Sequence, residues 1–264
     1  MNYFERLRAR SEAVGSLLCV GLDPDFKRHR VSDVGSYNRA IIEATAPYVA
    51  CYKPNIAFYE QYGIEGLRQL EATLAAIPSG IPVIGDVKRG DIGNTAAAYA
   101  RAMFEGWGFD AITLSPYLGR DSIEPFLEYG DRGLYLLCRT SNSGASDFQY
   151  LQVRGSRTLF EEIALTATSW SPAVGLVVGA TAPAELRAVR QLVPAASFLV
   201  PGIGAQGGDA TESIRAAGGE PGSIVVSASR SIMYASSGSD FAEAAGRAAR
   251  ELRGQLAAAV ASSV

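Results

Sequence analysis

Residues 83–95 read Val-Ile-Gly-Asp-Val-Lys-Arg-Gly-Asp-Ile-Gly-Asn-Thr, and the rest of the chain repeats the pattern that they set. The apolar run leading into them, residues 81–84, predicts a buried strand. The Ala-rich segment at residues 92–105 predicts a helix, with two glycines supplying the turn before it. A short buried strand followed at once by a helix is the repeating unit of a parallel sheet.

Three ionisable residues, Asp86, Lys88 and Asp91, follow the predicted strand. Because side chains alternate between the two faces of a strand, Asp86 and Lys88 are expected to point the same way. Asp91 lies close to the predicted helix start. The group can be interpreted as an ion-paired helix cap. It can also be interpreted as a functional site, because charges at the end of an apolar strand are costly unless they are paired or used.

The alternation of strand and helix continues along the chain. Further strands are expected at residues 17–22, 49–53, 111–114, 134–138, 174–178, 197–200 and 224–227. The other helices are expected at residues 2–10, 34–48, 60–77, 122–128, 157–169, 184–192, 210–217 and 241–260.

This count predicts an α/β fold, a (β/α)₈ TIM barrel with a parallel eight-stranded core, formed by residues 1–264 as one domain. A doubly wound open sheet is the alternative. It is disfavoured because no Gly-x-Gly-x-x-Gly follows the first strand, and because polar residues follow every strand rather than one switch point.

Composition narrows the class of function. The net charge of −3 means that the chain has no excess of basic residues of the kind that binds nucleic acid. No apolar run reaches the length of a membrane helix. The N-terminus lacks a signal-peptide core, so a cytoplasmic location is expected. Cys19, Cys51 and Cys138 lie in separate apolar runs, which predicts buried thiols in a reducing compartment. His29 has no partner histidine, and no metal site is predicted.

Polar side chains gather at the predicted carboxyl ends of the strands. In a barrel these ends converge on one face, where active sites lie. Taken singly, each residue can be interpreted as a turn residue or a loop cap, but their joint placement favours a site. The residues are Asp23, Lys53, Asp86, Lys88, Asp91, Ser141, Gln206 and Arg230.

The segment after the seventh strand, Pro201-Gly-Ile-Gly-Ala-Gln-Gly-Gly-Asp, predicts an anion site. Its glycines let backbone N–H groups approach an anion, and a helix is predicted to begin directly after it. Arg230 follows the eighth strand and can pair bidentately with a phosphate. A merely flexible glycine-rich loop is the alternative. A phosphorylated small molecule fits best, with its other end facing Lys88.

Several motifs together resemble orotidine 5′-phosphate decarboxylase, and most of all its longer bacterial subgroup. They are Asp86-Val-Lys-Arg-Gly-Asp-Ile-Gly-Asn-Thr95, the segment 201–209, Ser229-Arg-Ser-Ile232, Gly21-Leu-Asp-Pro24, Tyr52-Lys-Pro-Asn55 and Arg139-Thr-Ser-Asn142. The departures are small. Val87, Asn94 and Ser143 stand where Ala, Ser and Pro are expected.

The resemblance implies a cofactor-independent decarboxylation of orotidine 5′-phosphate to UMP and CO₂, the last step of de novo pyrimidine biosynthesis. It implies that Lys88 protonates C6 while Asp86 lies against the substrate carboxylate. The other implied roles are as follows: Lys53 binds Asp86 and the ribose, Asp23 binds a ribose hydroxyl, Ser141 binds the pyrimidine, Gln206 and Arg230 hold the phosphate, Pro201 contacts the substrate, and Asp91, Ile92 and Thr95 reach the neighbouring site of a homodimer.

Two other classes of protein remain as alternatives. Sugar-phosphate decarboxylases and aldolases on similar barrels share the Asp-x-Lys-x-x-Asp motif and use Mg²⁺. They need a carboxylate at the end of the second strand, where this chain has Lys53. A non-catalytic nucleotide-binding barrel would keep the phosphate loop but lose part of the charged array, which here is whole.

Overall fold

The computed structural model describes residues 1–28, 31–203 and 208–262, so His29 and Gln206 lie outside the described residues. Within these ranges eight parallel strands form one sheet. They are β1 (Leu18–Gly21), β2 (Cys51–Lys53), β3 (Ile84–Arg89), β4 (Ala111–Leu114), β5 (Gly133–Arg139), β6 (Val174–Val178), β7 (Phe198–Pro201) and β8 (Ile224–Ala228). The helices are α1 (Tyr3–Val14), α2 (Val34–Thr45), α3 (Ala57–Glu60), α4 (Gly63–Ala76), α5 (Gly93–Arg101), α6 (Glu124–Leu127), α7 (Leu159–Thr168), α8 (Pro183–Leu192), α9 (Ala210–Ala217), α10 (Arg230–Met233) and α11 (Phe241–Ala261).

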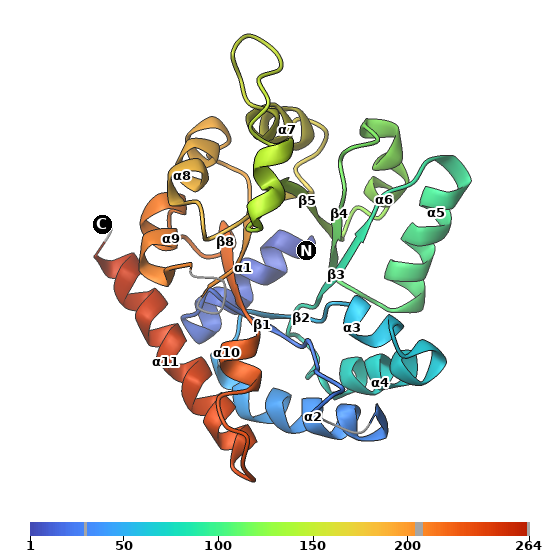
Figure 1. Cartoon of the computed structure of the whole chain (residues 1–264), viewed down its shortest axis with the longest axis vertical. Coiled ribbons are helices and arrows are strands. Elements are labelled where there is room, and N and C mark those ends of the chain that lie inside the picture. The colour runs from blue at the N-terminus through green and yellow to red at the C-terminus, as the bar shows by residue number, and fades with distance from the viewer. Residues whose placement is uncertain (29–30, 204–207, 263–264) are drawn as a thin grey trace.

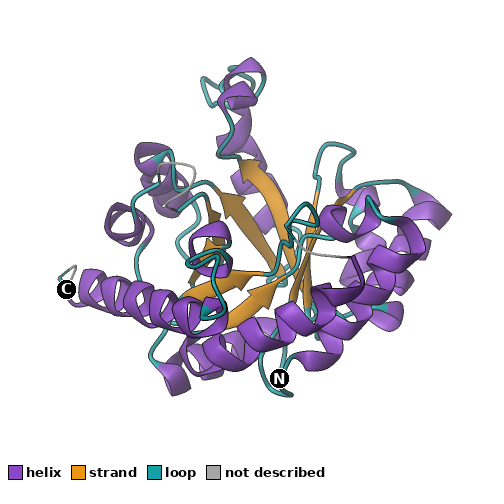
Figure 2. Cartoon of the chain, turned by 60° about the horizontal axis from the view of Figure 1, so that its bottom comes forward, coloured by secondary structure: helices purple, strands orange, loops and turns teal. Residues whose placement is uncertain are grey.

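The sheet closes into a barrel. Its strand order is β2-β1-β8-β7-β6-β5-β4-β3, so β2 and β3 are the two edges. Isolated parallel bridges join these edges at Tyr52–Val83 and at Asn55–Asp86. Figures 1 and 2 show the strands at the centre with helices around them. The predicted (β/α)₈ barrel is therefore confirmed, and its closing seam passes through one of the predicted site residues.

Strand alternation divides the core into two layers. The inner layer takes one residue from each strand in turn, namely Cys19, Cys51, Ile84, Ala111, Tyr135, Val177, Leu199 and Val225. The outer layer packs the opposite faces of the strands against the helices. Tyr3 and Leu7 of α1 join the inner layer, and Tyr3 meets Tyr135 edge to face. Helix α1, which lies behind the barrel in Figure 1, thereby covers one end and leaves the other for a site.

The three cysteines are buried and unpaired, as the sequence predicted. Burial raises the pKa of Cys51 and of Cys138, which keeps these thiols protonated and inert. None of the helices in the described part of the chain is both long and apolar enough to cross a membrane.

Most predicted element boundaries are close, but several are wrong. Strand β3 begins at Ile84, not at residue 81, because Ile81 is hydrogen-bonded in a turn to Pro78 and Pro82 has no N–H to donate. The helix expected at residues 60–77 is α4, which begins only at Gly63, whose φ is +59°, and the short helix α3 before it was not predicted. The helix expected at residues 92–105 becomes a π-helix from Ala102, and α10 was not predicted.

Candidate active site

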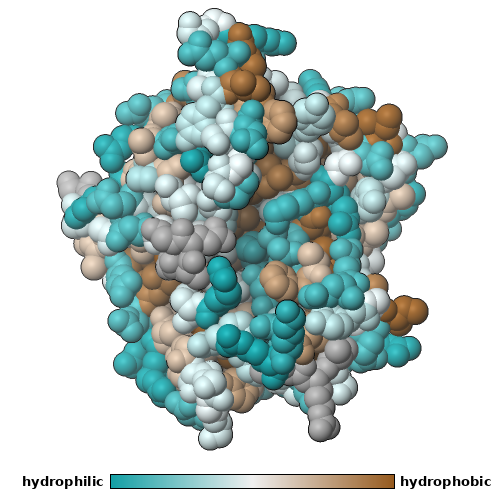
Figure 3. Space-filling model, in the orientation of Figure 1, coloured by the Kyte–Doolittle hydropathy of each residue, from teal (hydrophilic) through white to brown (hydrophobic). Residues whose placement is uncertain are grey.

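A cavity of about 810 Å³ lies at the carboxyl ends of the strands. Side chains from every strand or the loop after it contribute to its wall, as expected for a barrel active site. They include Asp23, Lys53, Asp86, Lys88, Thr113, Leu137, Ser141, Val177, Leu199, Pro201, Ser227 and Arg230. Hydrophilic side chains gather around the middle of the face shown in Figure 3.

Lys53, Asp86 and Lys88 form a charged cluster in this cavity. The Lys53 ammonium lies 3.2 Å from Oδ2 of Asp86, and the Lys88 ammonium lies 2.5 Å from Oδ1. Thr113 donates its hydroxyl proton to the same Oδ1 at 2.9 Å. The side chains of Lys53 and Asp86 are only 7% and 12% exposed, whereas that of Lys88 is 48% exposed. The carboxylate is therefore fixed from both sides, and one ammonium remains accessible from the cavity.

Lys53 and Asp86 hold each other in the charged state. Burial alone would raise the pKa of Asp86, but Lys53, Lys88 and the hydrogen bonds from Lys88 and Thr113 outweigh it and leave this pKa well below its ordinary value. Burial alone would lower the pKa of Lys53, but the carboxylates of Asp86 and Asp23 outweigh it and raise this pKa. Both groups are thus ionised at neutral pH.

Asp23 ties the loop after β1 to the loop after β2. Its Oδ1 accepts a hydrogen bond of 3.0 Å from the N–H of Asn55. Gly21 precedes it, and a Cβ there would lie 2.7 Å from the Cβ of Ser229. The missing side chain lets the loops after β1 and β8 approach each other next to Asp23.

Ser141 is held in place by the loop after β5. The N–H of Thr140 donates to Oε1 of Gln149 at 2.9 Å, and Nε2 of Gln149 donates back to the Thr140 hydroxyl at 2.8 Å. Thr181 donates to the carbonyl of Ser141 at 3.2 Å. A long loop thus presents a short, well-anchored segment to the cavity.

The described part of the predicted anion site includes Pro201, Gly202 and Arg230, all of which line the cavity. The N–H of Gly208 donates to the carbonyl of Gly202 at 3.0 Å, which ties these two glycines together. Asp209 caps α9 by accepting from the N–H of Glu212, so this helix end already has one of its donors satisfied.

Asp91, Ile92 and Thr95 stand apart from the rest and do not line the cavity. Ile92 is 56% exposed, Thr95 is exposed, and Asp91 is half-buried. Oδ1 of Asp91 accepts from the N–H of Ile92 at 2.8 Å, but the cap residue of α5 is Ile92 itself, and it makes no side-chain cap bond. The helix-cap interpretation of Asp91 therefore finds no support in the structure.

Sequence reasoning missed several residues of the cavity wall. Thr113 and Asn55 hold the predicted residues, as described above. The hydroxyl of Tyr234 accepts from the N–H of Asp25 at 2.5 Å, and the Arg28 guanidinium lies 4.6 Å from the centre of the Tyr234 ring. Only the position of Asn55, two residues after Lys53, offered a signal in the sequence.

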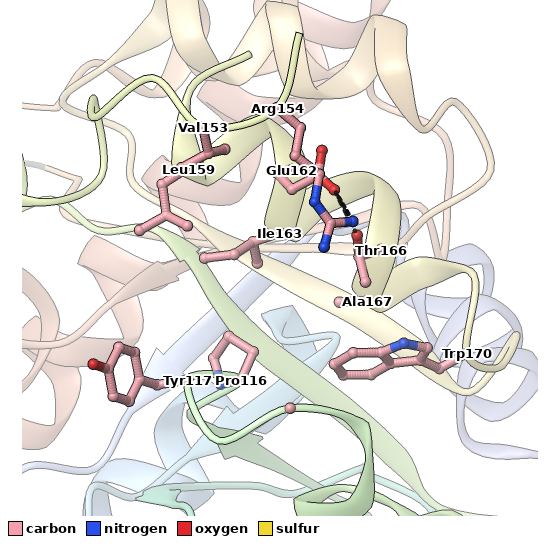
Figure 4. A pocket seen from close by; sticks show the side chains of 11 residues that line it. Pro116, Tyr117, Val153, Arg154, Leu159, Glu162, Ile163, Thr166, Ala167 and Trp170 are labelled. Carbon is pink, nitrogen blue, oxygen red and sulfur yellow. Dashed lines mark hydrogen bonds and ion pairs between the residues drawn. The ribbon is translucent and has the colours of Figure 1, made fainter. Parts of the chain in front are cut away.

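A second, smaller hollow of about 330 Å³ lies between the loop after β4 and helix α7 (Figure 4). Pro116, Ile163 and Trp170 form much of its apolar wall, and Arg154 pairs with Glu162 at 3.3 Å across one side. Because it holds a single ion pair among mostly apolar side chains, the larger cavity is the better candidate for chemistry. Among the described residues no group of three or more His, Cys, Asp or Glu side chains is placed to hold a metal ion.

Comparison with known proteins gives consistent matches. A family model described as orotidine 5′-phosphate decarboxylase / HUMPS family matches residues 16–245. The orotidine 5′-phosphate decarboxylase of Dehalococcoides mccartyi is 48% identical over 260 residues, 96% of each chain. The structure of Leishmania donovani OMP decarboxylase is 40% identical with a TM-score of 0.86, over 98% of this chain and 99% of that one. That of Leishmania donovani UMP synthase is 42% identical with a TM-score of 0.86, over 97% of this chain but 57% of that one.

The fold and these relatives define the class of protein as a (β/α)₈-barrel enzyme of the carboxy-lyase type. The chain belongs to the orotidine 5′-phosphate decarboxylase / HUMPS family.

Proposed function

We propose that this enzyme decarboxylates orotidine 5′-phosphate to UMP and CO₂ without a cofactor, as the last step of de novo pyrimidine biosynthesis. The observation that carries the proposal is the charged cluster, in which Lys88 has an accessible ammonium fixed beside a carboxylate that is ionised at neutral pH. The name shared by the curated relatives supports the choice of substrate.

The proposed reaction needs a cation where negative charge develops. The C6–carboxyl bond breaks and CO₂ leaves. The electron pair of the broken bond stays on C6 of the pyrimidine. The Lys88 ammonium stabilises this charge and then donates its proton to C6. Asp86 lies against the departing carboxylate, and Lys53 holds Asp86 in position.

The remaining cavity residues would bind the parts of the substrate that do not react. Asp23 and Lys53 bind the ribose, Ser141 binds the pyrimidine, and Arg230, Pro201 and Gln206 bind the phosphate. The described members of this set all line the same cavity, which supports the assignment. Binding of the remote phosphate can then contribute to the rate at C6.

We also propose a cytoplasmic homodimer of the longer bacterial subgroup, each chain a single domain. Asp91, Ile92 and Thr95 would complete the site of the other chain. Their position outside the cavity of their own chain, and above all the exposed apolar side chain of Ile92, supports this arrangement. The buried thiols support a reducing compartment.

The experiment is to follow the ultraviolet absorbance of orotidine 5′-phosphate after adding the purified protein in the presence of EDTA. Conversion to UMP under chelation is the expected result. Turnover that appears only after Mg²⁺ is restored would instead favour the metal-dependent sugar-phosphate enzymes on similar barrels. Absence of turnover in both conditions, from a folded protein, would favour a nucleotide-binding barrel.

A further inference from the structure

Strand β3 contains a bulge at the charged cluster. Gly85 pairs with Ile112 of β4, but the next paired residue of β3, Arg89, lies opposite Leu114. Four steps along β3 therefore match two steps along β4, so two extra residues are accommodated between the pairs. Bulges of this kind re-aim side chains next to active sites.

The hydroxyl of Thr113 takes over the hydrogen bonds that the bulge removes from the ladder. Its Oγ1 accepts from the N–H of Val87 and from the N–H of Lys88, each at 3.0 Å. It also donates to Oδ1 of Asp86 at 2.9 Å. A threonine hydroxyl has one donor and two acceptor positions, and all three are used here. Thr113 is 1% exposed, so water cannot readily replace it.

Lys88 has an unusual backbone conformation at this point. Its φ is +45°, in the left-handed region that a side chain with a Cβ rarely occupies. Such a conformation persists only where the surroundings hold it. The bond from the Lys88 N–H to Thr113 is a direct restraint on this residue, and the same hydroxyl restrains the carboxylate to which the Lys88 ammonium is paired.

We propose that Thr113 is a positioning residue for the reaction. By holding the bulge and Asp86 together, it fixes the position of the Lys88 ammonium. This inference rests on the proposed function, because it assigns Lys88 the proton transfer. A hydroxyl is the required group, since serine retains one donor and two acceptor positions whereas valine keeps only the shape.

The test compares Thr113→Val with Thr113→Ser in the full-length protein. Thr113→Val should lower kcat about 10- to 100-fold, because small misplacement of a reacting group has effects of this size. KM should change less than kcat, because the phosphate contacts are untouched. Thr113→Ser should restore most of kcat. Thr73→Val is the matched control, since Thr73 is equally buried and hydrogen-bonded but lies in helix α4, away from the cavity.

A second measurement keeps this inference separable from the proposed function. Hydrogen exchange of the Val87 and Lys88 amides should be slow in the wild type and in Thr113→Ser, and fast in Thr113→Val. Equal kcat in Thr113→Val and the wild type, or the same kcat loss in Thr113→Ser as in Thr113→Val, would overturn the positioning role. If the wild type has no decarboxylase activity, the proposed function fails, and the positioning role that rests on it fails too. Amide exchange would still decide whether Thr113 holds the bulge.

Discussion

The charged cluster and Arg230 lie in the same cavity, but among the described residues the charges of the cluster are paired with one another and that of Arg230 is not. In the cluster, each lysine lies within 3.2 Å of the Asp86 carboxylate, and the side chains of Lys53 and Asp86 are largely shielded from solvent. Arg230 is exposed and, within the described residues, makes no salt bridge. A cluster whose charges are already paired is suited to keep one geometry during a reaction, because it does not need to reorganise. An unpaired cation is available to bind an anionic ligand.

The variant with the largest expected effect is Lys88→Ala, which removes a charge from the paired cluster. We expect kcat to fall by about 10⁴-fold or more, because both the stabilising charge and the proton donor are lost. Stability should change little, since the Lys88 side chain is half-exposed. The measurements are turnover of orotidine 5′-phosphate and thermal unfolding. Arg68→Ala, which removes an exposed cation from α4, should leave both unchanged. Near-normal turnover in Lys88→Ala would remove this residue from the proton transfer.

The next test asks whether Asp91 belongs to the cluster of another chain. Lys88→Ala and Asp91→Ala should each be inactive alone. An equal mixture that exchanges subunits should regain about a quarter of the wild-type activity, because half of the dimers are mixed and one of their two sites is intact. The recovered activity is measured after mixing and compared with that of each variant mixed with itself. No recovery from chains shown to have exchanged would place Asp91 in the site of its own chain.

Arg230→Ala tests the other side of the comparison. We expect kcat/KM to fall about 10²- to 10³-fold, mainly through KM, because a charged contact to the phosphate is lost. The fold should be unaffected by loss of an exposed side chain. Arg187→Ala is the control, since Arg187 is exposed on α8 and does not line the cavity. If KM is unchanged, Arg230 does not bind the phosphate.

The smallest expected effect is the pH dependence of stability. The pKa of Asp86 is lower in the folded protein than its ordinary value of 3.8, so the unfolded chain takes up the proton first as the pH falls. The contribution of the Asp86 carboxylate to the free energy of unfolding is complete above its ordinary pKa and is lost as the pH drops through the folded pKa. The free energy of unfolding then changes by at most about 1.4 kcal/mol per pH unit. Urea unfolding in acid should therefore show a steeper loss in the wild type than in Asp86→Asn.

Asp121→Asn makes the same chemical change at an exposed position and should retain the wild-type slope. Identical acid slopes in the wild type and Asp86→Asn would mean that Lys53 and Lys88 do not stabilise the Asp86 carboxylate in the folded state.

Much of the barrel could be predicted because its signals are local. Residues 111–114, 174–178 and 210–217 were predicted with the observed boundaries, since a buried strand or an amphipathic helix is visible in the hydrophobic pattern. The period of two predicted a common face for Asp86 and Lys88, and their side chains do meet, but the bulge in β3 and the left-handed backbone of Lys88 mean that regular alternation is not what brings them together. Prediction of boundaries was poorest where local backbone features interrupt the hydrophobic pattern, as at Gly63 with its positive φ and at the turn and proline before β3.

Thr113 shows why part of the site could not be predicted. In the sequence it is a β-branched residue in an apolar strand, which is a common core position. Its hydrogen bonds arise only because β3 and β4 pair with a bulge, and no local pattern records the pairing of two strands. Tyr234 is similar, because its contact with Asp25 joins residues 209 positions apart.

The sequence by itself determined the alternation of strands and helices, the parallel barrel and the residue types at the strand ends, because these depend on local periodicity and on motifs. Only the tertiary structure decided which of those residues share a cavity. It brought Lys53 to Asp86 across the β2–β3 seam and left Asp91, five residues further along, outside. The physical reason is that ion pairing and burial depend on distances between separate elements, which barrel closure sets and local sequence does not.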